Sequence, residues 1–287
     1  MAQTIFVTGG AGFIGRELTK KLLATGDEVV CLDVGEQFTR HADFFAEIGR
    51  SARLSIVRGT ILDRTLLQMT MRGADAVVHL AAMLGVRRTE KNRLRCLEIN
   101  TSGTDMVLAA AAFNGVEHVV FTSSSEVYGE PDRNPIRETD TTKGKTVYAV
   151  SKMAGEELVK GYHQIFPGSD YTIVRLFNTY GEGQVAQFVL SKFVKAVLEG
   201  QNPVVFGDGS QKRGYCHVED STGGLVEILR NPAARGKTYN LGNSSELYSL
   251  AQLAQKVIDT LAPGKGLEVE ILDGFDGSDR TREREIF

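Results

Sequence analysis

The stretch VTGGAGFIG, residues 7–15, follows an apolar run and opens an amphipathic pattern. Glycine-rich turns of this spacing allow a tight bend, a close approach of the backbone to a pyrophosphate, and packing of a helix on a strand. The N-terminus of the following helix supplies oriented N–H donors to the phosphate. We therefore expect a dinucleotide at this turn, and its candidate contacts are Gly9, Gly12, Phe13, Ile14 and Gly15.

An acidic residue ends the second apolar run. Asp33 closes EVVCLD, residues 28–33, and lies 18 residues beyond Gly15. A carboxylate at this point accepts hydrogen bonds from an adenosine ribose and repels a 2′-phosphate. The glycine motif alone would indicate only a glycine-rich turn, but here a strand precedes it, a helix follows it and the acidic residue is present. Together these features predict binding of NAD rather than NADP.

Short β-type runs alternate with longer amphipathic stretches over the first 180 residues. The runs are rich in Val, Ile and Phe and nearly continuous in apolarity, as expected of parallel strands that are covered on both faces. This alternation predicts an α/β fold with a Rossmann-type, doubly wound parallel sheet. We expect residues 1–180 to form an NAD-binding domain. Residues 181–287, where the rhythm changes, should form mainly a smaller C-terminal α/β substrate-binding lobe, with some segments packing back on the first domain.

The composition argues against several kinds of function. The net charge of −3 is unlike that of a general nucleic-acid binder, which usually needs a basic face. The three cysteines, Cys31, Cys96 and Cys216, are far apart, and no pair of histidines has metal-ligand spacing, so we expect no disulfide framework and no metal site. No stretch approaches the roughly 20 apolar residues of a membrane span. We therefore expect a cytoplasmic protein that acts neither on nucleic acid nor at a membrane.

Two further strand ends are candidates for the wall of the cofactor site. RGTILD, residues 58–63, and HLAA, residues 79–82, close the third and fourth predicted strands. Ligands of doubly wound sheets lie at the carboxyl ends of the strands. The expected cofactor contacts here are Thr60, Ile61, Leu80, Ala81 and Ala82. His79 stands inside an apolar strand, and we expect it to be a hydrogen-bonded core residue.

A hydroxyl, a phenol and an ammonium occur in a pattern typical of proton transfer. SSSEVYG, residues 123–129, ends the fifth predicted strand, and YAVSK, residues 148–152, opens a helix. Tyr148 and Lys152 are four residues apart, so they lie on one helix face. A nearby ammonium stabilises a phenolate, and we expect it to lower the tyrosine pKa from about 10. The tyrosine can then take a proton from an alcohol while a nicotinamide accepts hydride from the same carbon.

The serines at the strand end are candidates to hold the reacting oxygen, and Ser125 is a candidate substrate contact. Taken alone, the YxxxK spacing also fits a surface helix with a core tyrosine. The glycine turn and the serine-bearing strand end favour the catalytic interpretation. Glu126 follows Ser124 by two positions, so an extended strand end would direct both side chains into the same cleft.

In the order of its motifs the chain resembles the extended short-chain dehydrogenase/reductase family, in its branch of NAD-dependent nucleotide-sugar epimerases, dehydratases and decarboxylases. The matching pieces span nearly the whole chain and are TGGAGFIG, HLAA, NTSGT, SSSEVYG, YAVSK, RLFNTYGEGQ, GDGSQKRGYCHVEDS and YNLGN. The resemblance implies NAD as cofactor and a nucleotide-diphosphate sugar as substrate. It places the catalytic serine on Ser124, the base on Tyr148 and the assisting lysine on Lys152, and the last two also border the cofactor.

The same resemblance implies roles for residues outside these motifs' catalytic core. Asn100 corresponds to a residue near the cofactor wall. Asn178 and Arg213 match positions that usually contact the sugar diphosphate, and arginine suits a diphosphate because its donors form a rigid fork. Arg280 is a candidate for a second phosphate contact. The chain departs from the family at Thr60, where an Asp commonly meets the adenine, and in a short loop after YGEGQ.

Members of this branch first oxidise a hexose hydroxyl, usually at C4, with NAD. A C4-epimerase then needs only rotation of the keto sugar and return of the hydride, so Ser124, Tyr148 and Lys152 suffice, and we expect this reaction. Nucleotide-uronic-acid decarboxylation is a close alternative because the pair Ser125-Glu126 resembles that of decarboxylases. A dehydratase that uses Glu126 is a further alternative. A noncatalytic NAD-binding sensor and a net reductase are more remote.

Relatives in this family commonly dimerise through two helices from each subunit. The corresponding helices would span residues 101–113 and 148–164. Their small residues, Ala109 to Ala112, Ala154 and Gly155, would allow close approach of a second subunit. The alternative is that these residues pack only on the subunit's own sheet. We expect a homodimer.

Overall fold

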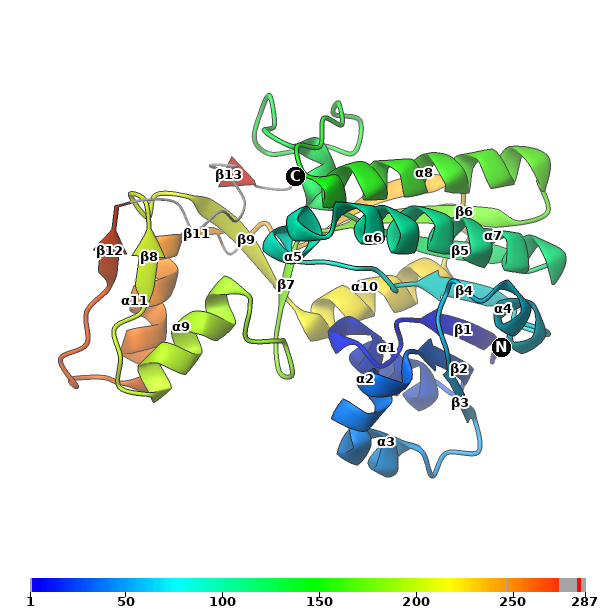
Figure 1. Ribbon diagram of the computed structural model, residues 1–287, viewed down its shortest axis with the longest axis horizontal. Coiled ribbons are helices and arrows are strands. Elements are labelled where there is room, and N and C mark those ends of the chain that lie inside the picture. The colour runs from blue at the N-terminus through cyan, green and yellow to red at the C-terminus, as the bar shows by residue number, and fades with distance from the viewer. Residues whose placement is uncertain (1, 246, 274–282, 285–287) are drawn as a thin grey trace.

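A seven-stranded parallel sheet forms the larger of two lobes in the computed structural model, which describes residues 2–245, 247–273 and 283–284 (Figure 1). Its strands are β1 (Thr4–Thr8), β2 (Glu28–Asp33), β3 (Leu54–Arg58), β4 (Ala76–His79), β5 (His118–Ser124), β6 (Asp170–Leu176) and β10 (Lys237–Leu241). Their order is β10-β6-β5-β4-β1-β2-β3, so the winding reverses direction between β1 and β4. This confirms the predicted Rossmann-type, doubly wound sheet.

Helices cover both faces of the sheet, as the continuous apolarity of its strands requires. In β1, Ile5 and Val7 pack into the core under one set of helices, whereas Phe6 packs into the core under the other. The first set consists of α1 (Phe13–Ala24), α2 (Gly35–Arg40), α3 (Ala42–Ile48) and α10 (Val218–Arg230). The second set consists of α4 (Arg64–Thr70), α7 (Gly103–Phe113) and α8 (Val147–Ile165).

Short helical turns lead into α7 and leave β5. The turns before α7 follow one another directly and are α5 (Val86–Lys91), α6 (Arg93–Leu97) and the π-helical turn η1 (Glu98–Ser102). π-helical turns are rare and are often found at functional sites. Two 3-10 turns, η2 (Ser125–Tyr128) and η3 (Pro232–Ala234), follow β5 and α10.

The smaller lobe is built from short strands and two amphipathic helices, seen on the left of Figure 1. Its elements are β7 (Asn178–Tyr180), α9 (Val189–Leu198), β8 (Val204–Phe206), β9 (Lys212–His217), β11 (Leu247–Ser249), α11 (Leu250–Leu261), β12 (Glu270–Leu272) and β13 (Glu283–Arg284). β9 pairs with β7, β11 and β13, and β8 pairs with β12. Apolar residues of α9 and α11 form a separate core with Val205 and Tyr215.

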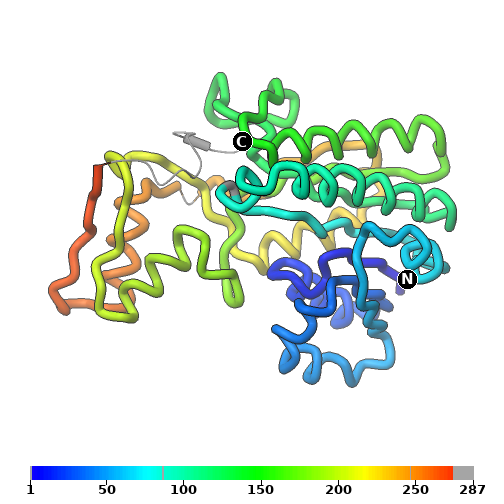
Figure 2. The backbone as a smooth tube through the Cα atoms, in the orientation of Figure 1, coloured from blue at the N-terminus to red at the C-terminus, as the bar shows by residue number. Residues whose placement is uncertain are grey.

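Two elements from the second half of the chain belong to the larger lobe. β10 pairs with β6 at the edge of the sheet, and α10 packs beside α1 (Figure 2). The chain leaves the sheet after β6, forms β7 to β9, and returns through α10 and β10 before it forms α11. Because β7 starts two residues after β6 ends, this path carries the smaller lobe to the carboxyl edge of the sheet.

Candidate active site

The glycine turn between β1 and α1 is shaped for a phosphate. Gly9 has a φ of +71°, and its N–H donates to the Leu32 carbonyl over 2.8 Å. A Cβ on Gly9 would lie 2.7 Å from the Ala81 nitrogen, and one on Gly15 would collide with the Gly9 carbonyl. Gly12 is the N-cap of α1 and has no side chain to cap it, so the first N–H groups of the helix remain for a ligand. These features fit the pyrophosphate of a dinucleotide.

Asp33 ends β2 beside this turn. Its Oδ1 accepts the Val34 N–H over 2.8 Å, and its Oδ2 accepts the Ala11 N–H over 3.1 Å. Burial raises the pKa of Asp33, and the backbone N–H groups around it act in the opposite direction. A carboxylate has room for further donors, so Asp33 can also accept ribose hydroxyls. Phe13 and Ile14 form the first turn of α1 and are half-buried.

The residues after β4 lie against the glycine turn. Leu80, Ala81 and Ala82 are half-buried, and the Ala81 N–H donates to the Thr8 hydroxyl of β1 over 3.2 Å. The last residue of β4, His79, is 1% exposed, and each ring nitrogen is hydrogen-bonded to a threonine hydroxyl. Burial lowers the pKa of His79 to about 3, so it is neutral at pH 7. His79 is a core residue, as expected.

The residues after β3 divide between surface and core. Thr60 is exposed, and its hydroxyl accepts the Leu62 N–H over 3.2 Å. Ile61 is only 4% exposed and packs in the core under α7, where a Cβ on Gly103 would lie 2.5 Å from its Cδ1. The Ile61 side chain is therefore committed to the core, and any contact with a cofactor would come from its backbone.

Asn100, in the π-helical turn η1, connects two distant segments through its side-chain amide. It is 2% exposed, and its Oδ1 accepts the Met83 N–H over 2.7 Å. Its Nδ2 donates to the Met83 carbonyl and to the Ser151 hydroxyl, each over 2.9 Å. Asn100 thus ties the segment after β4 to α8, the helix that carries Tyr148. The Asn100 amide is occupied by these bonds within the protein.

Ser124, Tyr148 and Lys152 meet at the carboxyl end of β5. Ser124 is the last residue of β5, and its hydroxyl lies near enough to the Tyr148 phenol to act on its pKa. Thr146 caps α8 by accepting the Ala149 N–H over 3.1 Å, which fixes Tyr148 in the first turn. Lys152 is 3% exposed, and its Nζ donates to the Thr122 carbonyl over 2.7 Å.

The pKa of Tyr148 differs from the expectation. Burial raises it above its usual value and the charge of Glu126 adds to this, while the hydrogen bond to Ser124 acts in the opposite direction. Lys152 was expected to lower this pKa, but in the structure its ammonium is turned to the Thr122 carbonyl and lies 5.0 Å from the Phe121 ring centre. Burial lowers the pKa of Lys152 to about 8. Desolvation therefore outweighs the effect of the ammonium on the pKa of Tyr148.

Glu126 lies near Ser124 and Tyr148, but on a 3-10 turn rather than on an extended strand end. β5 ends at Ser124, and Glu126 lies in the 3-10 turn η2, so the alternation of an extended strand does not apply. The turn is closed by the Glu126 N–H, which donates to the Ser124 hydroxyl over 3.2 Å. The carboxylate accepts the Thr146 hydroxyl over 3.0 Å and acts on the pKa of Tyr148. Glu126 is thus fixed between the start of α8 and the phenol.

The predicted substrate residues are placed differently from one another. Asn178 is exposed at the start of β7, and Arg213 is 6% exposed on the neighbouring β9. Arg213 donates from Nη1 to the Lys212 carbonyl over 2.7 Å. Ser125 is only 3% exposed, so its side chain is buried in the protein. Arg280 lies outside the described residues.

A buried network beneath the site was missed from the sequence. The Glu156 carboxylate accepts both Nε and Nη2 of Arg175, over 2.9 and 2.7 Å, and the Ser123 hydroxyl over 2.5 Å. The Arg175 guanidinium also donates to the Tyr128 hydroxyl over 2.8 Å. Glu156 follows Lys152 by one helical turn, so the sequence could have placed it on the same helix face as Tyr148 and Lys152. The network holds β5, β6 and α8 together beside Ser124, Tyr148 and Lys152.

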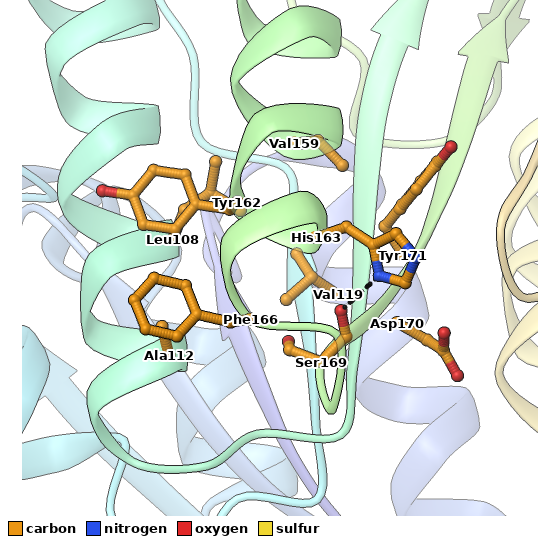
Figure 3. Close-up of a pocket in the computed structure, with 10 residues that line it drawn as sticks. All are labelled: Leu108, Ala112, Val119, Val159, Tyr162, His163, Phe166, Ser169, Asp170 and Tyr171. Atoms are coloured by element: carbon orange, nitrogen blue, oxygen red, sulfur yellow. Dashed lines mark hydrogen bonds between the residues drawn. The ribbon is translucent and has the colours of Figure 1, made fainter.

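A shallow pocket between α7 and α8 is not part of this site (Figure 3). It is lined by Asp170 and Tyr171 at the amino end of β6, where the His163 ring is hydrogen-bonded to the Ser169 carbonyl over 3.1 Å. Ligands of doubly wound sheets bind at the opposite, carboxyl edge. Within the described ranges no group of three or more His, Cys, Asp or Glu side chains could hold a metal ion, and no helix could span a membrane.

The glycine turn, the carboxylate that follows β2 and the Ser-Tyr-Lys group on a doubly wound sheet define an enzyme of the extended short-chain dehydrogenase/reductase class. Within that class the chain belongs to the NAD dependent epimerase/dehydratase family, whose model matches residues 5–242. Its cofactor is NAD. The chain is 33% identical over 267 residues to a UDP-N-acetyl-alpha-D-glucosaminuronate decarboxylase of Bacillus cytotoxicus, covering 90% of this chain and 80% of that protein. It is 31% identical over 266 residues to a dTDP-glucose 4,6-dehydratase of Streptomyces niveus, covering 91% and 78%.

Solved structures of the same family superimpose along almost the whole chain. A UDP-glucuronic acid 4-epimerase from Bacillus cereus, in complex with UDP-glucuronic acid and NAD, has a TM-score of 0.90 at 27% identity and covers 99% of this chain and 90% of its own. DesIV, a dTDP-glucose 4,6-dehydratase from Streptomyces venezuelae with NAD bound, has a TM-score of 0.89 at 30% identity, covering 99% and 88%. Epimerases, decarboxylases and dehydratases are thus all represented among its relatives.

Proposed function

We propose that this protein is an NAD-dependent nucleotide-sugar C4-epimerase that acts through a transient 4-keto sugar. The observation that carries the proposal is the meeting of Ser124, whose hydroxyl acts on the pKa of Tyr148, with that phenol and with the buried Lys152 one helical turn further along α8. These are the groups needed to move one proton at one carbon. Bound at the glycine turn, NAD supplies the hydride acceptor.

Each of the three residues has its own task in this proposal. Tyr148 takes the proton of the C4 hydroxyl, and Ser124 holds the same oxygen by its hydrogen bond. Because burial raises the pKa of Tyr148, the phenol is protonated at rest and must be activated when the complex forms. Lys152, with a pKa of about 8, carries most of its charge at pH 7 and stabilises the phenolate as it forms. After the keto sugar has rotated in the site, the same phenol returns the proton to the C4 oxygen as the hydride returns to C4.

Epimerisation asks nothing further of the site. Once C4 is a ketone, its two faces differ only in which one is presented to the reduced cofactor. No second acid or base is needed, and the Glu126 carboxylate is already engaged by Thr146 at the cap of α8. In this proposal Glu126 positions the phenol and the start of the helix.

A second candidate is decarboxylation of a nucleotide uronic acid, or dehydration of a nucleotide sugar. The observation that favours it is the placement of Glu126 in the turn η2. Its charge raises the pKa of Tyr148, although Tyr148 belongs to α8. A carboxylate beside the reacting phenol could act on C5 or its substituent after oxidation at C4. The relatives named as decarboxylase and dehydratase support keeping this candidate.

Glu126→Gln separates the two candidates. The amide keeps the size of the side chain and its hydrogen bonding but removes proton transfer. For an epimerase we expect a loss of about tenfold or less, because acid–base roles contribute about 10²–10⁴-fold and positioning contributes less. A decarboxylase or dehydratase would instead accumulate a 4-keto sugar with bound NADH, seen as lasting absorbance in a single turnover. Glu130→Gln is the matched control, since Glu130 pairs with Lys145 on the surface of the same loop.

Product analysis with UDP-, GDP-, dTDP- and CDP-sugars, uronic acids included, tests the proposal as a whole. An inverted C4 centre without net change in NADH is the expected result. Absence of turnover with every nucleotide sugar would favour a noncatalytic NAD-binding sensor. Steady consumption of NADPH would favour a net reductase, which Asp33 disfavours by its charge.

For the substrate we propose a division of the chain into two functional parts. Residues 1–180 bind NAD, and residues 181–287 mainly bind the nucleotide sugar, while α10 and β10 return to the sheet. Asn178 and Arg213 contact the diphosphate in this proposal, supported by their positions on adjacent strands next to the catalytic edge. Arg280 is proposed as a second phosphate contact on the resemblance alone.

We also propose a homodimer formed through α7 and α8. Apolar side chains are exposed on these two helices at Phe113, Val150 and Ile165, which are 68%, 49% and 72% exposed. The small residues contribute less than expected, because Ala110, Ala111 and Gly155 are buried against the subunit's own sheet. Light scattering at micromolar concentration tests this, and a monomer would contradict it. A cytoplasmic location is proposed on the three free, buried cysteines, which suit a reducing compartment.

A further inference from the structure

The loop that joins β7 to α9, residues 181–188, reaches back from the smaller lobe to the larger one. Figure 1 shows it extending beside α1, and the Arg16 Nη2 of that helix donates to the Gly183 carbonyl over 3.2 Å. Gly183 has a φ of +80°, and a Cβ on it would lie 2.5 Å from the same Nη2. A glycine at this position therefore lets the backbone of the loop come directly against the guanidinium.

The Arg16 side chain is held on the larger lobe. Arg16 lies one turn after the N-cap Gly12 of α1, and its Cζ is 5.6 Å from the centre of the Phe44 ring of α3. Burial lowers the pKa of Arg16, and the charge of Glu182 in the loop acts in the opposite direction. The guanidinium thus combines a contact with an aromatic ring of its own lobe and interactions with a carboxylate and a carbonyl of the loop. Contacts of both kinds are favourable for a cation.

The other end of the loop touches a second part of the larger lobe. The Gln187 amide lies beside Gly85, where an added Cβ would be 3.4 Å from its Nε2. Gly85 belongs to the segment after β4, three residues beyond Ala82. The loop therefore contacts α1 through Arg16 and the segment after β4 through Gly85. These two segments follow β1 and β4, the strands between which the winding of the sheet reverses.

A loop that contacts both sides of this reversal crosses the place at which a dinucleotide binds in doubly wound sheets. The glycine turn lies on one side, and the segment that begins with Leu80 lies on the other. Between its two contacts the loop is fastened to the smaller lobe. The Gln184 amide donates to the Thr179 carbonyl of β7 over 2.7 Å and accepts the Ser191 hydroxyl of α9 over 3.1 Å. The loop is therefore tied to the smaller lobe at its middle and to the larger lobe at two other points.

We propose that residues 181–188 form a strap across the cofactor site and that Arg16 is the positioning residue that fastens it. The strap retains the cofactor, and the need for this rests on the proposed function. A hydride that leaves C4 must return to the same sugar, so NADH has to stay bound until the second hydride transfer. Residues 185–187 are exposed, so few buried contacts oppose opening of the strap. The contact between Arg16 and Gly183 then sets how often it opens.

Arg16→Gln tests the proposal on the NADH-loaded protein, in which loss of the cofactor is followed by its fluorescence after mixing with excess NAD. We expect the dissociation rate of NADH to rise about threefold to thirtyfold, because one hydrogen bond and one cation–π contact are removed. The association rate should also rise, since the same strap must open for entry, so the Kd should change less than either rate. Lys20→Gln is the matched control and should leave both rates unchanged, because Lys20 is exposed one turn further along the same helix.

Gln187→Ala loosens the other end of the strap and leaves α1 and the glycine turn unaltered. It should raise both rates, as Arg16→Gln does, and it keeps the proposal testable if that variant does not fold. With a nucleotide sugar that the unaltered protein converts, both variants should lose activity during turnover as NADH escapes. Added NAD should restore that activity.

The contrary results are distinct from one another. Unchanged rates in both variants would overturn the strap. Faster dissociation of NADH from Arg16→Gln at an unchanged association rate would also overturn it, because Arg16 would then hold the cofactor itself. The proposed function fails separately, by absence of turnover with every nucleotide sugar, since both rates are measured without a substrate.

Discussion

Replacing Glu156 with Gln would leave the guanidinium of Arg175 buried without its carboxylate. The two side chains are 4% and 6% exposed, and they share a bidentate pair of hydrogen bonds. Burial alone would lower the pKa of Arg175, but the hydrogen bonds and charge of Glu156 outweigh it and hold this pKa above its usual value. The pair therefore depends on both members.

The expected loss follows from this geometry. Removing one member of a buried ion pair destabilises a protein by about 3–5 kcal/mol, because the other charge remains without compensation. In a protein of this size that corresponds to a fall in melting temperature of roughly 5–15 °C. Glu157→Gln is the matched control on the same helix. Glu157 pairs with Lys160 at 73% and 40% exposure, and exposed pairs contribute about 0–1 kcal/mol.

Scanning calorimetry of both variants, with NAD present and absent, decides the matter. Arg175→Gln combined with Glu156→Gln removes both charges and should recover part of the stability. Equal melting temperatures for Glu156→Gln and Glu157→Gln would refute the reasoning. Turnover should also fall in Glu156→Gln, because the Ser123 hydroxyl, one residue before Ser124, exchanges a charged carboxylate acceptor for a weaker amide acceptor.

Three further predictions concern catalysis, the cofactor and pH. Tyr148→Phe should lower turnover by about 10²–10⁴-fold without loss of NAD, and retention of more than half the activity would place the base elsewhere. Asp33→Ser should narrow the preference for NAD over NADP measured by calorimetry, whereas equal binding of both to the unaltered chain would contradict the role of Asp33. Burial lowers the pKa of His118 to about 4, from the ordinary value of 6.5 that applies in the unfolded chain. The stability that neutral His118 contributes is therefore full above pH 6.5 and is lost as the pH falls towards 4. Melting curves of His118→Gln should show a shallower fall, by up to about 1.4 kcal/mol per pH unit.

The sheet and the meeting of distant motifs could be predicted because they follow from local rules. Parallel strands end at one edge, so the residues after β1, β2, β4 and β5 had to come together. Tyr148 and Lys152 then needed only one turn of helix to share a face. The turn residues, Asp33 and the core role of His79 are visible in short segments of sequence for the same reason.

The remaining features depend on burial and on contacts between distant segments, which a local pattern does not contain. The raised pKa of Tyr148 comes from desolvation by the folded chain. Glu126 reaches the phenol through a 3-10 turn that an extended strand end did not suggest. Asn100 was expected near the cofactor wall, but its side-chain amide is occupied by hydrogen bonds to Met83 and Ser151. These partners are 17 and 51 residues away in the sequence. Small residues of α7 and α8 are equally ambiguous until one knows which face is turned to the sheet.

The late return of β10 and α10 has a consequence for how the protein is made. When residue 180 has just left the ribosome, β6 has β5 on one side but still lacks its outer neighbour β10, and α1 lacks α10, the helix that packs beside it. Both arrive only after residues 181–217 have been synthesised. The nascent sheet must wait with an open, apolar edge, which is a site of aggregation in any β structure. We therefore expect an N-terminal fragment that ends at residue 180 to aggregate rather than to remain a stable cofactor lobe.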